Sequence, residues 1–355
     1  MNVLKRIDWQ LMMAVALLCG AGLVSLLSSH QDLFWKQCAW CGVGLVVALI
    51  LTLVDLRSFF SHRGFVLSFY YVTVGLLALT YFFAPAVKGN RAWLFIGPFQ
   101  FQPAELAKVA LILVLARYLA KCHVSIGRWR TIAMSLLWCV PLVGFIAVQP
   151  DMGSALMLLI IWGCLVLMSG LPLKRVAIGA LAAILIGGLL WGFVLKGYQK
   201  ERIIGAFNPE RDPLGVNYNI IQSKIAIGSG GWFGKGFGQG TQTQLGFLPE
   251  GHNDFIFSAI AEEGGFFAIL VLIIAYVWMM VRILKMGARS DNNMYAFVCL
   301  GTAALFFGQF FFNVGSATGL LPVIGVTLPF VSYGGSSILA NMILIGMIQS
   351  FWARK

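Results

Sequence analysis

Long apolar runs without charge constrain this chain more than any other feature of its sequence. Residues 9–31, 64–87, 131–150, 152–173 and 176–195 each lack Asp, Glu, Lys and Arg. Each run is long enough to cross a hydrocarbon core of about 30 Å as an α-helix. Because lipid offers no water to backbone polar groups, only helices and closed barrels span membranes, and runs this apolar are not barrel strands. We therefore predict an all-α fold, a polytopic bundle of membrane helices.

These runs, together with shorter ones, predict about ten transmembrane helices. Charged residues make up 11% of the chain, whereas a soluble domain carries about 25%. Because so few charges cannot cover a surface that faces water, we expect most of the chain to lie in a membrane. The helices are predicted near residues 10–28, 37–54, 64–83, 103–120, 131–149, 152–169, 175–195, 255–281, 294–313 and 331–351.

The distribution of basic residues predicts the orientation of the bundle. The net charge of +12 is also typical of proteins that bind nucleic acid, but short cytoplasmic loops of membrane proteins are enriched in Lys and Arg. With the N-terminus in the cytoplasm, fifteen of the 25 basic residues fall on the inner side. We therefore expect both termini to be cytoplasmic and no nucleic-acid partner. The fifteen are Lys5, Arg6, Arg57, Arg63, Arg117, Lys121, Arg128, Arg130, Lys174, Arg175, Arg282, Lys285, Arg289, Arg354 and Lys355.

One long hydrophilic loop, residues 196–254, lies within a single membrane domain that covers residues 1–355. It precedes the eighth predicted helix and is expected on the extracytoplasmic side. Loops of this length are usually functional. Within it, NYNIIQSKIAIG (217–228) has the apolar spacing of a short amphipathic helix at the membrane interface.

Two segments rich in glycine or proline are expected to have irregular backbone. GSGGWFGKGFGQG (228–240) lacks the spacing of a Walker A or GxGxxG motif. It is interpreted either as a flexible hinge or as backbone that passes close to a bulky ligand, and the sequence leaves both open. GSATGLLPVIGVTLPF (315–330) lies in a long uncharged stretch. Since irregular backbone at membrane depth must be buried in protein or line a cavity, we expect this segment to dip into the membrane.

Charged residues at the outer ends of predicted helices are candidate functional residues, because charge near membrane depth is costly. Glu105 follows Pro103 in the first turn of a helix and can pair with Lys108 at i, i+3. Asp151 stands in a tight turn between two apolar helices. Each carboxylate has two interpretations that the sequence leaves open, a helix cap and the lining of an active site.

A second set of candidates is basic. Arg202, Arg211 and Lys224 lie in the long loop, and Arg91 lies in an earlier outer loop. Alone, each would be a solvated surface charge. Together they are predicted to hold a phosphate group, which favours Arg and Lys.

Asp254 is the leading candidate for a catalytic group. It stands where the long loop enters the eighth predicted helix, beside Phe255 and Phe257. Partly dry surroundings can tune a carboxylate as a base, although an N-cap is the simpler interpretation. Glu262 and Glu263 follow two turns later and are expected deeper in the membrane, paired or protonated.

Five segments of this chain, taken together, resemble the SEDS family (shape, elongation, division and sporulation) of peptidoglycan glycosyltransferases, and most closely its RodA branch. The resemblance covers most of the chain beyond residue 90. One departure is Gly251, where an arginine is common in the branch. The segments that carry it are RAWLFIGPFQFQPAELAK (91–108), QPDMGSAL (149–156), NYNIIQSKIAIGSGG (217–231), GKGFGQGTQTQLGFLPEGHNDFIF (234–257) and LPVIGVTLPFVSYGGSS (321–337).

The resemblance implies a ten-helix, multi-pass protein of the bacterial cytoplasmic (inner) membrane that polymerises lipid II into glycan strands on its outer face, during elongation and rod-shape maintenance. It matches Asp254 to the family's essential loop aspartate, and Glu105, Lys108 and Asp151 to polar residues of a central cavity. It also implies a class B penicillin-binding protein (a transpeptidase) as partner and dependence on a divalent cation (Mg²⁺ or Mn²⁺), for which the sequence locates no site.

The chemistry that such a reaction needs is compatible with these residues. A sugar hydroxyl is a poor nucleophile and needs a base. A lipid-linked pyrophosphate is already a good leaving group, so cations that stabilise its charge are of more use than a carboxylic acid. Two other functions stay open on the sequence, a flippase for lipid-linked precursor and a non-catalytic scaffold of the wall-synthesis complex.

Overall fold

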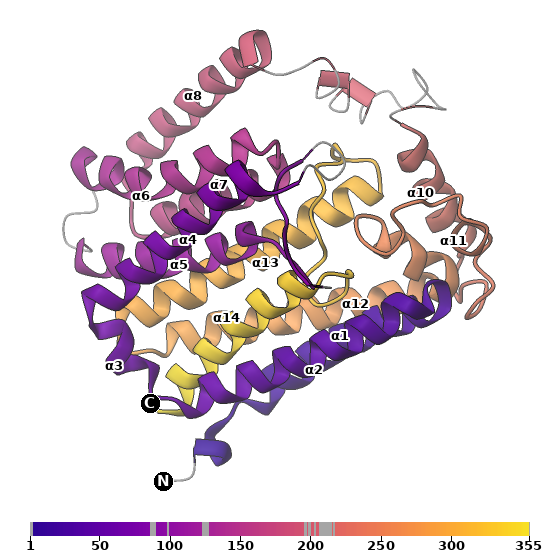
Figure 1. Ribbon diagram of the computed structural model, residues 1–355, viewed down its shortest axis with the longest axis horizontal. Coiled ribbons are helices and arrows are strands. Elements are labelled where there is room, and N and C mark those ends of the chain that lie inside the picture. Colours follow the sequence, from indigo (N-terminus) through magenta and orange to yellow (C-terminus); the bar gives the residue numbers. More distant parts are fainter. Residues whose placement is uncertain are drawn as a thin grey trace.

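The computed structural model describes residues 3–85, 90–97, 99–122, 128–194, 197, 200–201, 204–205, 215 and 217–354. Within these residues the chain is almost entirely helical (Figure 1). The elements are η1 (Val3–Arg6), α1 (Trp9–Ser29), α2 (Gln31–Leu53), α3 (Leu56–Ser61), α4 (Arg63–Phe83), β1 (Leu94–Ile96), β2 (Phe99–Phe101), α5 (Pro103–Cys122), α6 (Trp129–Val148), α7 (Met152–Met168), α8 (Leu173–Leu189), η3 (Leu190–Val194), α10 (Tyr218–Ser229), α11 (Thr241–Gln244), α12 (Ile256–Ala288), α13 (Asn293–Ala317) and α14 (Gly335–Ala353).

The predicted fold class is confirmed, and each of the ten predicted helices corresponds to a helix of the structure. In the described part of the chain, eight helices are long and apolar enough to cross a membrane: α1, α2, α4, α6, α8 with η3, α12, α13 and α14. The other two predicted spans are α5, which carries charges, and α7, which has 17 residues. Ten crossings therefore remain a prediction.

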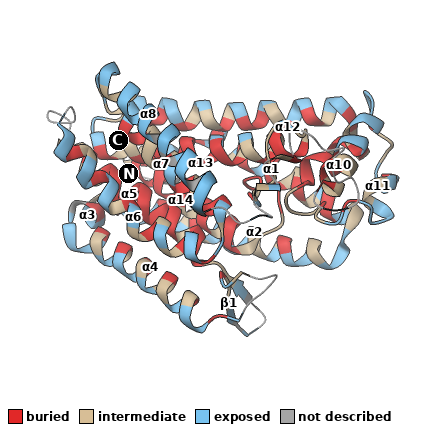
Figure 2. Cartoon of the chain, turned by 90° about the horizontal axis from the view of Figure 1, so that it is seen from above, coloured by how far each residue is buried: buried red, intermediate tan, exposed pale blue. Residues whose placement is uncertain are grey.

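Helix α5 forms the centre of the bundle. Fourteen of its 20 residues are buried, and it packs against α4, α6, α7, α13 and α14. Because α5 meets other helices rather than lipid on nearly every side, it can carry Glu105 and Lys108 near its start. By contrast, none of the described side chains of α8 is buried (Figure 2).

The two ends of the bundle can be told apart by their contacts. The chain termini lie at one end and α10 and α11 at the other (Figure 1). At the end with the termini, Asp8 forms an ion pair with Arg282, one of the basic residues predicted to be cytoplasmic. With the N-terminus in the cytoplasm, as predicted, the end with α10 and α11, which belong to the long loop, is the outer end.

Helix α12 is two helices joined at a break, and this corrects a prediction. Gly265 has φ 68°, a left-handed conformation that favours glycine. Before the break, Asp254 lies beside Asn313 and Ser258 beside Ser223, which also reaches Ala317 at the outer end of α13. The first leg of α12, residues 256–264, therefore leads outward.

Glu262 and Glu263 accordingly lie at the outer end and not deeper than Asp254. Ser28, in the last turn of α1, donates a hydrogen bond of 2.6 Å to Glu263. The second leg then runs back along α1 to Arg282 at the inner end. The prediction was wrong because the apolar stretch after Asp254 reads as one continuous helix.

The glycine-rich segment 228–240 packs against this break. Gly234 and Gly265 approach so closely that a Cβ added to Gly265 would lie 2.2 Å from the Gly234 nitrogen. The backbone N–H groups of Lys235 and Gly236 donate to the carbonyl groups of Glu262 and Glu263 at 2.9 and 3.0 Å. The backbone of this segment thus lies close to α12, and its two interpretations, a hinge and close approach to a ligand, both stay predictions.

The irregular segment between α13 and α14 re-enters the bundle. Leu328, Phe330 and Val331 are buried, and Tyr276 of α12 donates a hydrogen bond to the carbonyl of Pro329. Gly22 in α1 lies directly against the backbone of Val331. The backbone of this segment is thus covered by protein, as irregular structure at membrane depth requires.

Candidate active site

Asp254 lies just before the outward leg of α12 and does not cap it. The N-cap is Phe255, which makes no side-chain cap hydrogen bond. The side chain of Asp254 is partly exposed, and its Oδ2 lies 3.9 Å from the point where a Cβ on Gly325 would stand. The carboxylate therefore faces the irregular segment between α13 and α14, and the capping interpretation of Asp254 is not supported.

The backbone around Asp254 is held from both sides. The Nδ2 of Asn313 donates to the carbonyl of Asp254 at 3.1 Å and to that of Val326 at 2.8 Å. Ser332 Oγ donates to the carbonyl of Asn253 at 2.7 Å. These contacts join the end of the long loop to the irregular segment and fix where the carboxylate of Asp254 stands.

A small polar cavity of about 30 Å³ adjoins this position. Its walls come from the start of α5, the start of α7, α13 and residues 325–327. The predicted ion pair lines it: Lys108 Nζ lies 2.7 Å from Glu105 Oε1, and both side chains are buried. Among the described residues, Glu105 Oε2 has no hydrogen-bond partner. An unpartnered buried carboxylate oxygen is costly, and here it points to a polar ligand or water.

Asp151 is a helix cap, one of its two predicted roles, and it reaches the small cavity only through Gln102. Its Oδ1 accepts a hydrogen bond from the backbone N–H of Ser154 at 3.0 Å, which makes it the N-cap of α7. Its Oδ2 accepts from Gln102 Nε2 at 2.9 Å, and Gln102 lines the small cavity. Asp151 thus caps a helix and orients a cavity residue through the same carboxylate.

The structure describes only part of the predicted phosphate clamp, the set of basic residues Arg91, Arg202, Arg211 and Lys224. Lys224 is exposed on α10 and lies over Gly319. The residue before it, Ser223, is 2.6 Å from Ser258, about one helical turn beyond Asp254. Arg91 is exposed just before β1, and no contact joins it to this group in the described part of the chain. Arg202 and Arg211 lie outside the described residues, so the clamp stays a prediction.

Two functional candidates in α13 escaped the sequence analysis. Gln309 and Asn313 are buried, and they stand one helical turn apart, on one face. Gln309 lines the small cavity, and within the described residues neither its Oε1 nor its Nε2 has a partner. The available signal was the pair of neutral polar residues at i, i+4 in the apolar run FFGQFFFN.

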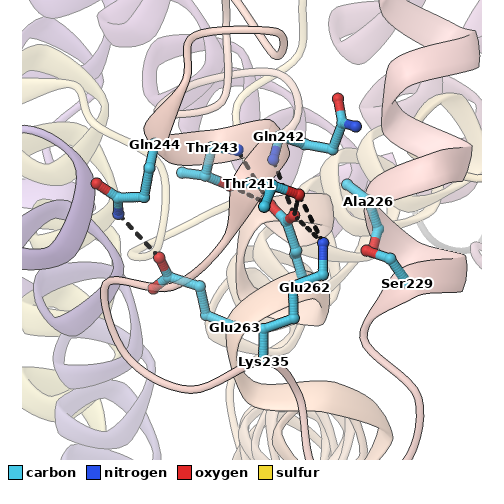
Figure 3. Close-up of polar contacts among 9 residues, drawn as sticks. All are labelled: Ala226, Ser229, Lys235, Thr241, Gln242, Thr243, Gln244, Glu262 and Glu263. Carbon is cyan, nitrogen blue, oxygen red and sulfur yellow. Dashed lines mark hydrogen bonds and ion pairs between the residues drawn. The ribbon is translucent and has the colours of Figure 1, made fainter.

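Glu262 and Glu263 hold the loop to α12 (Figure 3). Glu262 is fully buried. Lys235 Nζ donates to it at 2.8 Å, and the backbone N–H groups of Gln242 and Thr243 donate at 2.9 and 3.0 Å. Gln244 Nε2 donates to Glu263 at 3.0 Å. Glu262 is therefore paired, as expected for a buried carboxylate, and its partner is Lys235 from the glycine-rich segment.

The side chains near the cavity do not form a resident metal site. The residues that the structure describes include no group of three or more His, Cys, Asp and Glu that could hold an ion. Lys108 already neutralises Glu105 and would repel a cation. Mg²⁺ needs about six oxygen ligands, more than Asp254 and Glu105 supply. Dependence on Mg²⁺ or Mn²⁺ therefore stays a prediction.

Comparison with known proteins gives extensive matches. The family model of FtsW/RodA/SpoVE cell cycle proteins matches residues 6–354. The peptidoglycan glycosyltransferase MrdB of Escherichia coli is 36% identical over 349 residues, which is 97% of this chain and 93% of that protein. The probable peptidoglycan glycosyltransferase FtsW of Saccharophagus degradans is 32% identical over 361 residues, which is 97% of this chain and 92% of that protein.

Solved structures match over a similar length. A chain from a peptidoglycan synthase complex that coordinates polymerisation and crosslinking has a TM-score of 0.85 and 33% identity, covering 98% of this chain and 97% of that one. The rod shape determining protein RodA of Thermus thermophilus has a TM-score of 0.73 and 30% identity, covering 98% and 96%. With sequence and structure matched over nearly its whole length, this chain belongs to the FtsW/RodA/SpoVE family of cell cycle proteins.

Proposed function

We propose that this protein is a peptidoglycan glycosyltransferase that polymerises lipid II on the outer face of the bacterial cytoplasmic membrane, with Asp254 as the general base. The observation that carries the proposal is the placement of Asp254. Asp254 is not the N-cap of α12, its carboxylate faces Gly325 beside a polar cavity, and its backbone carbonyl accepts a hydrogen bond from Asn313. The names of the relatives, peptidoglycan glycosyltransferase MrdB and probable peptidoglycan glycosyltransferase FtsW, support the reaction class.

The proposed reaction uses one carboxylate and several cations. Asp254 accepts the proton of the acceptor sugar's 4-hydroxyl group, whose oxygen forms a bond to the anomeric carbon of the donor. The bond from that carbon to the undecaprenyl-pyrophosphate breaks, and the electron pair leaves with the pyrophosphate. Attack opposite the leaving group inverts the anomeric configuration. A base of this kind contributes about 10²–10⁴-fold to a rate.

The pyrophosphate is proposed to be held by Lys224, Arg91 and Arg202. Two observations support this role for Lys224: it is exposed, and the residue before it, Ser223, contacts Ser258 on the leg of α12 that follows Asp254. Glu105 and Lys108 are proposed to bind the substrate's polar groups at the small cavity, and Asp151 to orient Gln102 there. Mg²⁺ or Mn²⁺ is expected to arrive with the pyrophosphate, whose oxygen atoms are the ligands these ions prefer.

A partner that crosslinks the product is part of the proposal. A structural relative with a TM-score of 0.85 comes from a peptidoglycan synthase complex that coordinates polymerisation and crosslinking. We propose by analogy that this chain works with a class B penicillin-binding protein, which would crosslink the strands as they form.

Purified protein with lipid II in detergent tests the proposed function. A polymerase makes glycan strands in detergent, since the reaction needs only enzyme and substrate. A flippase needs two compartments and makes no polymer there. Absence of polymer from folded protein, with a partner transpeptidase and divalent cation supplied, would contradict the proposal.

A further inference from the structure

A second cavity lies at the inner end of the bundle, away from the candidate active site. It has a volume of about 310 Å³ and lies between α3, the connection from α12 to α13, and the end of α14. This volume is within the range of small-molecule sites, about 300–1,000 Å³. The proposed polymerase reaction, which takes place at the outer end, makes no use of it.

Arg57 lines the cavity, and in the described part of the chain two of its side-chain nitrogens lack a partner. Nε and Nη2 of Arg57 are buried and have no hydrogen-bond partner within the described residues. A guanidinium has five N–H donors in a planar fork that matches carboxylate and phosphate groups. Asp291 also lines the cavity, but no ion pair joins it to Arg57 in the part of the chain that the structure describes. These two buried nitrogens therefore lack an acceptor within the described residues.

Other groups around the cavity also favour an anion. Asn292 lines it and caps the N-terminus of α13, a helix of 25 residues, and this end of a helix carries partial positive charge. The hydroxyl group of Tyr295 is a further donor in the lining, whereas that of Ser290 already donates to the carbonyl of Asn292. The ring of Tyr295 is stacked on Phe351, with centroids 4.1 Å apart and an angle of 11° between the planes, so its hydroxyl is held in place.

The surroundings indicate a lipid rather than a soluble anion. On α3, Phe60 is buried and Phe59 is 47% exposed, so this short helix carries apolar side chains on its outer face as well as Arg57. Trp352, at the end of α14, lines the cavity, and Trp is enriched where membranes meet water. Basic pockets between membrane helices on the cytoplasmic side bind anionic lipid headgroups. Acyl chains could therefore lie against the exposed apolar residues while the phosphate enters the cavity.

We propose that this inner cavity binds the phosphate headgroup of an anionic phospholipid from the cytoplasmic leaflet. Arg57 binds the phosphate oxygens through Nε and Nη2, with the hydroxyl group of Tyr295 beside it. The N-terminus of α13 adds a favourable field. A free phosphate ester has the same charged group, so the source of the phosphate has to be tested directly.

Native mass spectrometry of the full chain, titrated in detergent with phosphatidylglycerol, tests the proposal. Wild-type protein should bind one phosphatidylglycerol more tightly than phosphatidylcholine. Arg57→Gln should raise the apparent Kd about tenfold, since hydrogen bonds to charged groups are among the stronger ones. The matched control is Arg63→Gln, an exposed inner residue on α4 that does not line the cavity, and it should stay within about twofold of wild type.

One further variant and one competition experiment test the same assignment. Ser290→Glu places a negative charge in the lining without touching Arg57, and it should weaken phosphatidylglycerol binding even if Arg57→Gln does not fold. Glycerol 3-phosphate should not compete at concentrations that match the lipid. Equal binding of phosphatidylcholine, full competition by glycerol 3-phosphate, or wild-type affinity in Ser290→Glu would each overturn the assignment to an anionic lipid.

Discussion

Asn313 is the residue on which the position of Asp254 most depends. Its single amide group donates to the carbonyls of Asp254 and Val326, so it joins the candidate base to the segment that the base faces. Asn313→Ala removes both bonds, each worth about 1 kcal/mol, while Asp254 itself is unchanged. Since about 1.4 kcal/mol is a tenfold change in rate, we expect polymerisation to fall about tenfold.

The initial rate of glycan synthesis per folded protein measures this effect. Thr302→Val is the matched control, because Thr302 is also buried in α13 and, among the described residues, its hydroxyl bonds only to Val298 of the same helix. It should keep a rate within about twofold of wild type. Equal losses of rate in both variants would mean that Asn313 only stabilises α13.

Substitution of Lys224, a residue that the structure describes, tests the predicted phosphate clamp. It is exposed, so Lys224→Ala should cost little stability. If it holds the pyrophosphate, the loss of a charge-assisted bond of about 1.5–3 kcal/mol should lower polymerisation about ten- to a hundredfold. Lys174→Ala, at an exposed inner position at the start of α8, should have no effect in the same assay. Matching rates for the two variants would remove Lys224 from the clamp.

At the scale of elements, the glycine-rich segment and the break in α12 form one unit. Glu262 fastens it, because this buried carboxylate accepts hydrogen bonds from Lys235, Gln242 and Thr243. Glu262→Gln removes the charge that pairs with Lys235 and leaves an N–H₂ group facing backbone donors. Breaking a buried ion pair costs about 3–5 kcal/mol, and Lys235 is partly exposed, so we expect a loss of about 2–4 kcal/mol.

Thermal unfolding of Glu262→Gln measures this loss, and limited proteolysis near residue 239 reports release of the loop. Glu263→Gln is the natural comparison, since Glu263 is partly exposed and accepts only from Ser28 and Gln244 in the described contacts. It should lose less than about 1 kcal/mol. A melting temperature as low in Glu263→Gln as in Glu262→Gln would contradict the role given to Glu262.

At the scale of the whole molecule, the two ends of the bundle should face opposite sides of the membrane. Gln239, in the glycine-rich segment, and Asp291, between α12 and α13, are both exposed. In a background without the seven native cysteines, a membrane-impermeant thiol reagent added to intact cells should label Gln239→Cys and not Asp291→Cys. Labelling of both from the outside would contradict the topology.

The sequence predicted the helices and much of the site. Uncharged runs of about 20 residues are sufficient to locate membrane helices, and the i, i+3 spacing of Glu105 and Lys108 was sufficient to predict their ion pair. The outward leg of α12 was not predicted, because Gly264 and Gly265 lie in an apolar stretch that reads as one helix. Gln309 and Asn313 were missed because neutral polar residues in an apolar run acquire a role only through contacts between distant segments.

The central claim is that the Asp254 carboxylate acts as a base, and Asp254→Asn tests it most directly. Asn keeps the size of the side chain but cannot accept a proton near neutral pH. Because Asp254 is not the N-cap of α12 and Asn has nearly the same shape, the variant should fold and melt like wild type. Glu250→Gln, a carboxylate four residues earlier in the same loop, is the matched control and should retain its activity.

The measurement is glycan yield from purified Asp254→Asn with lipid II, beside its melting temperature. We predict that polymerisation falls about 10²–10⁴-fold, the usual contribution of a general base, while the melting temperature stays unchanged. Polymerisation near the wild-type rate in the folded variant would contradict the claim, and the base would then have to be sought at Glu105 or Asp151.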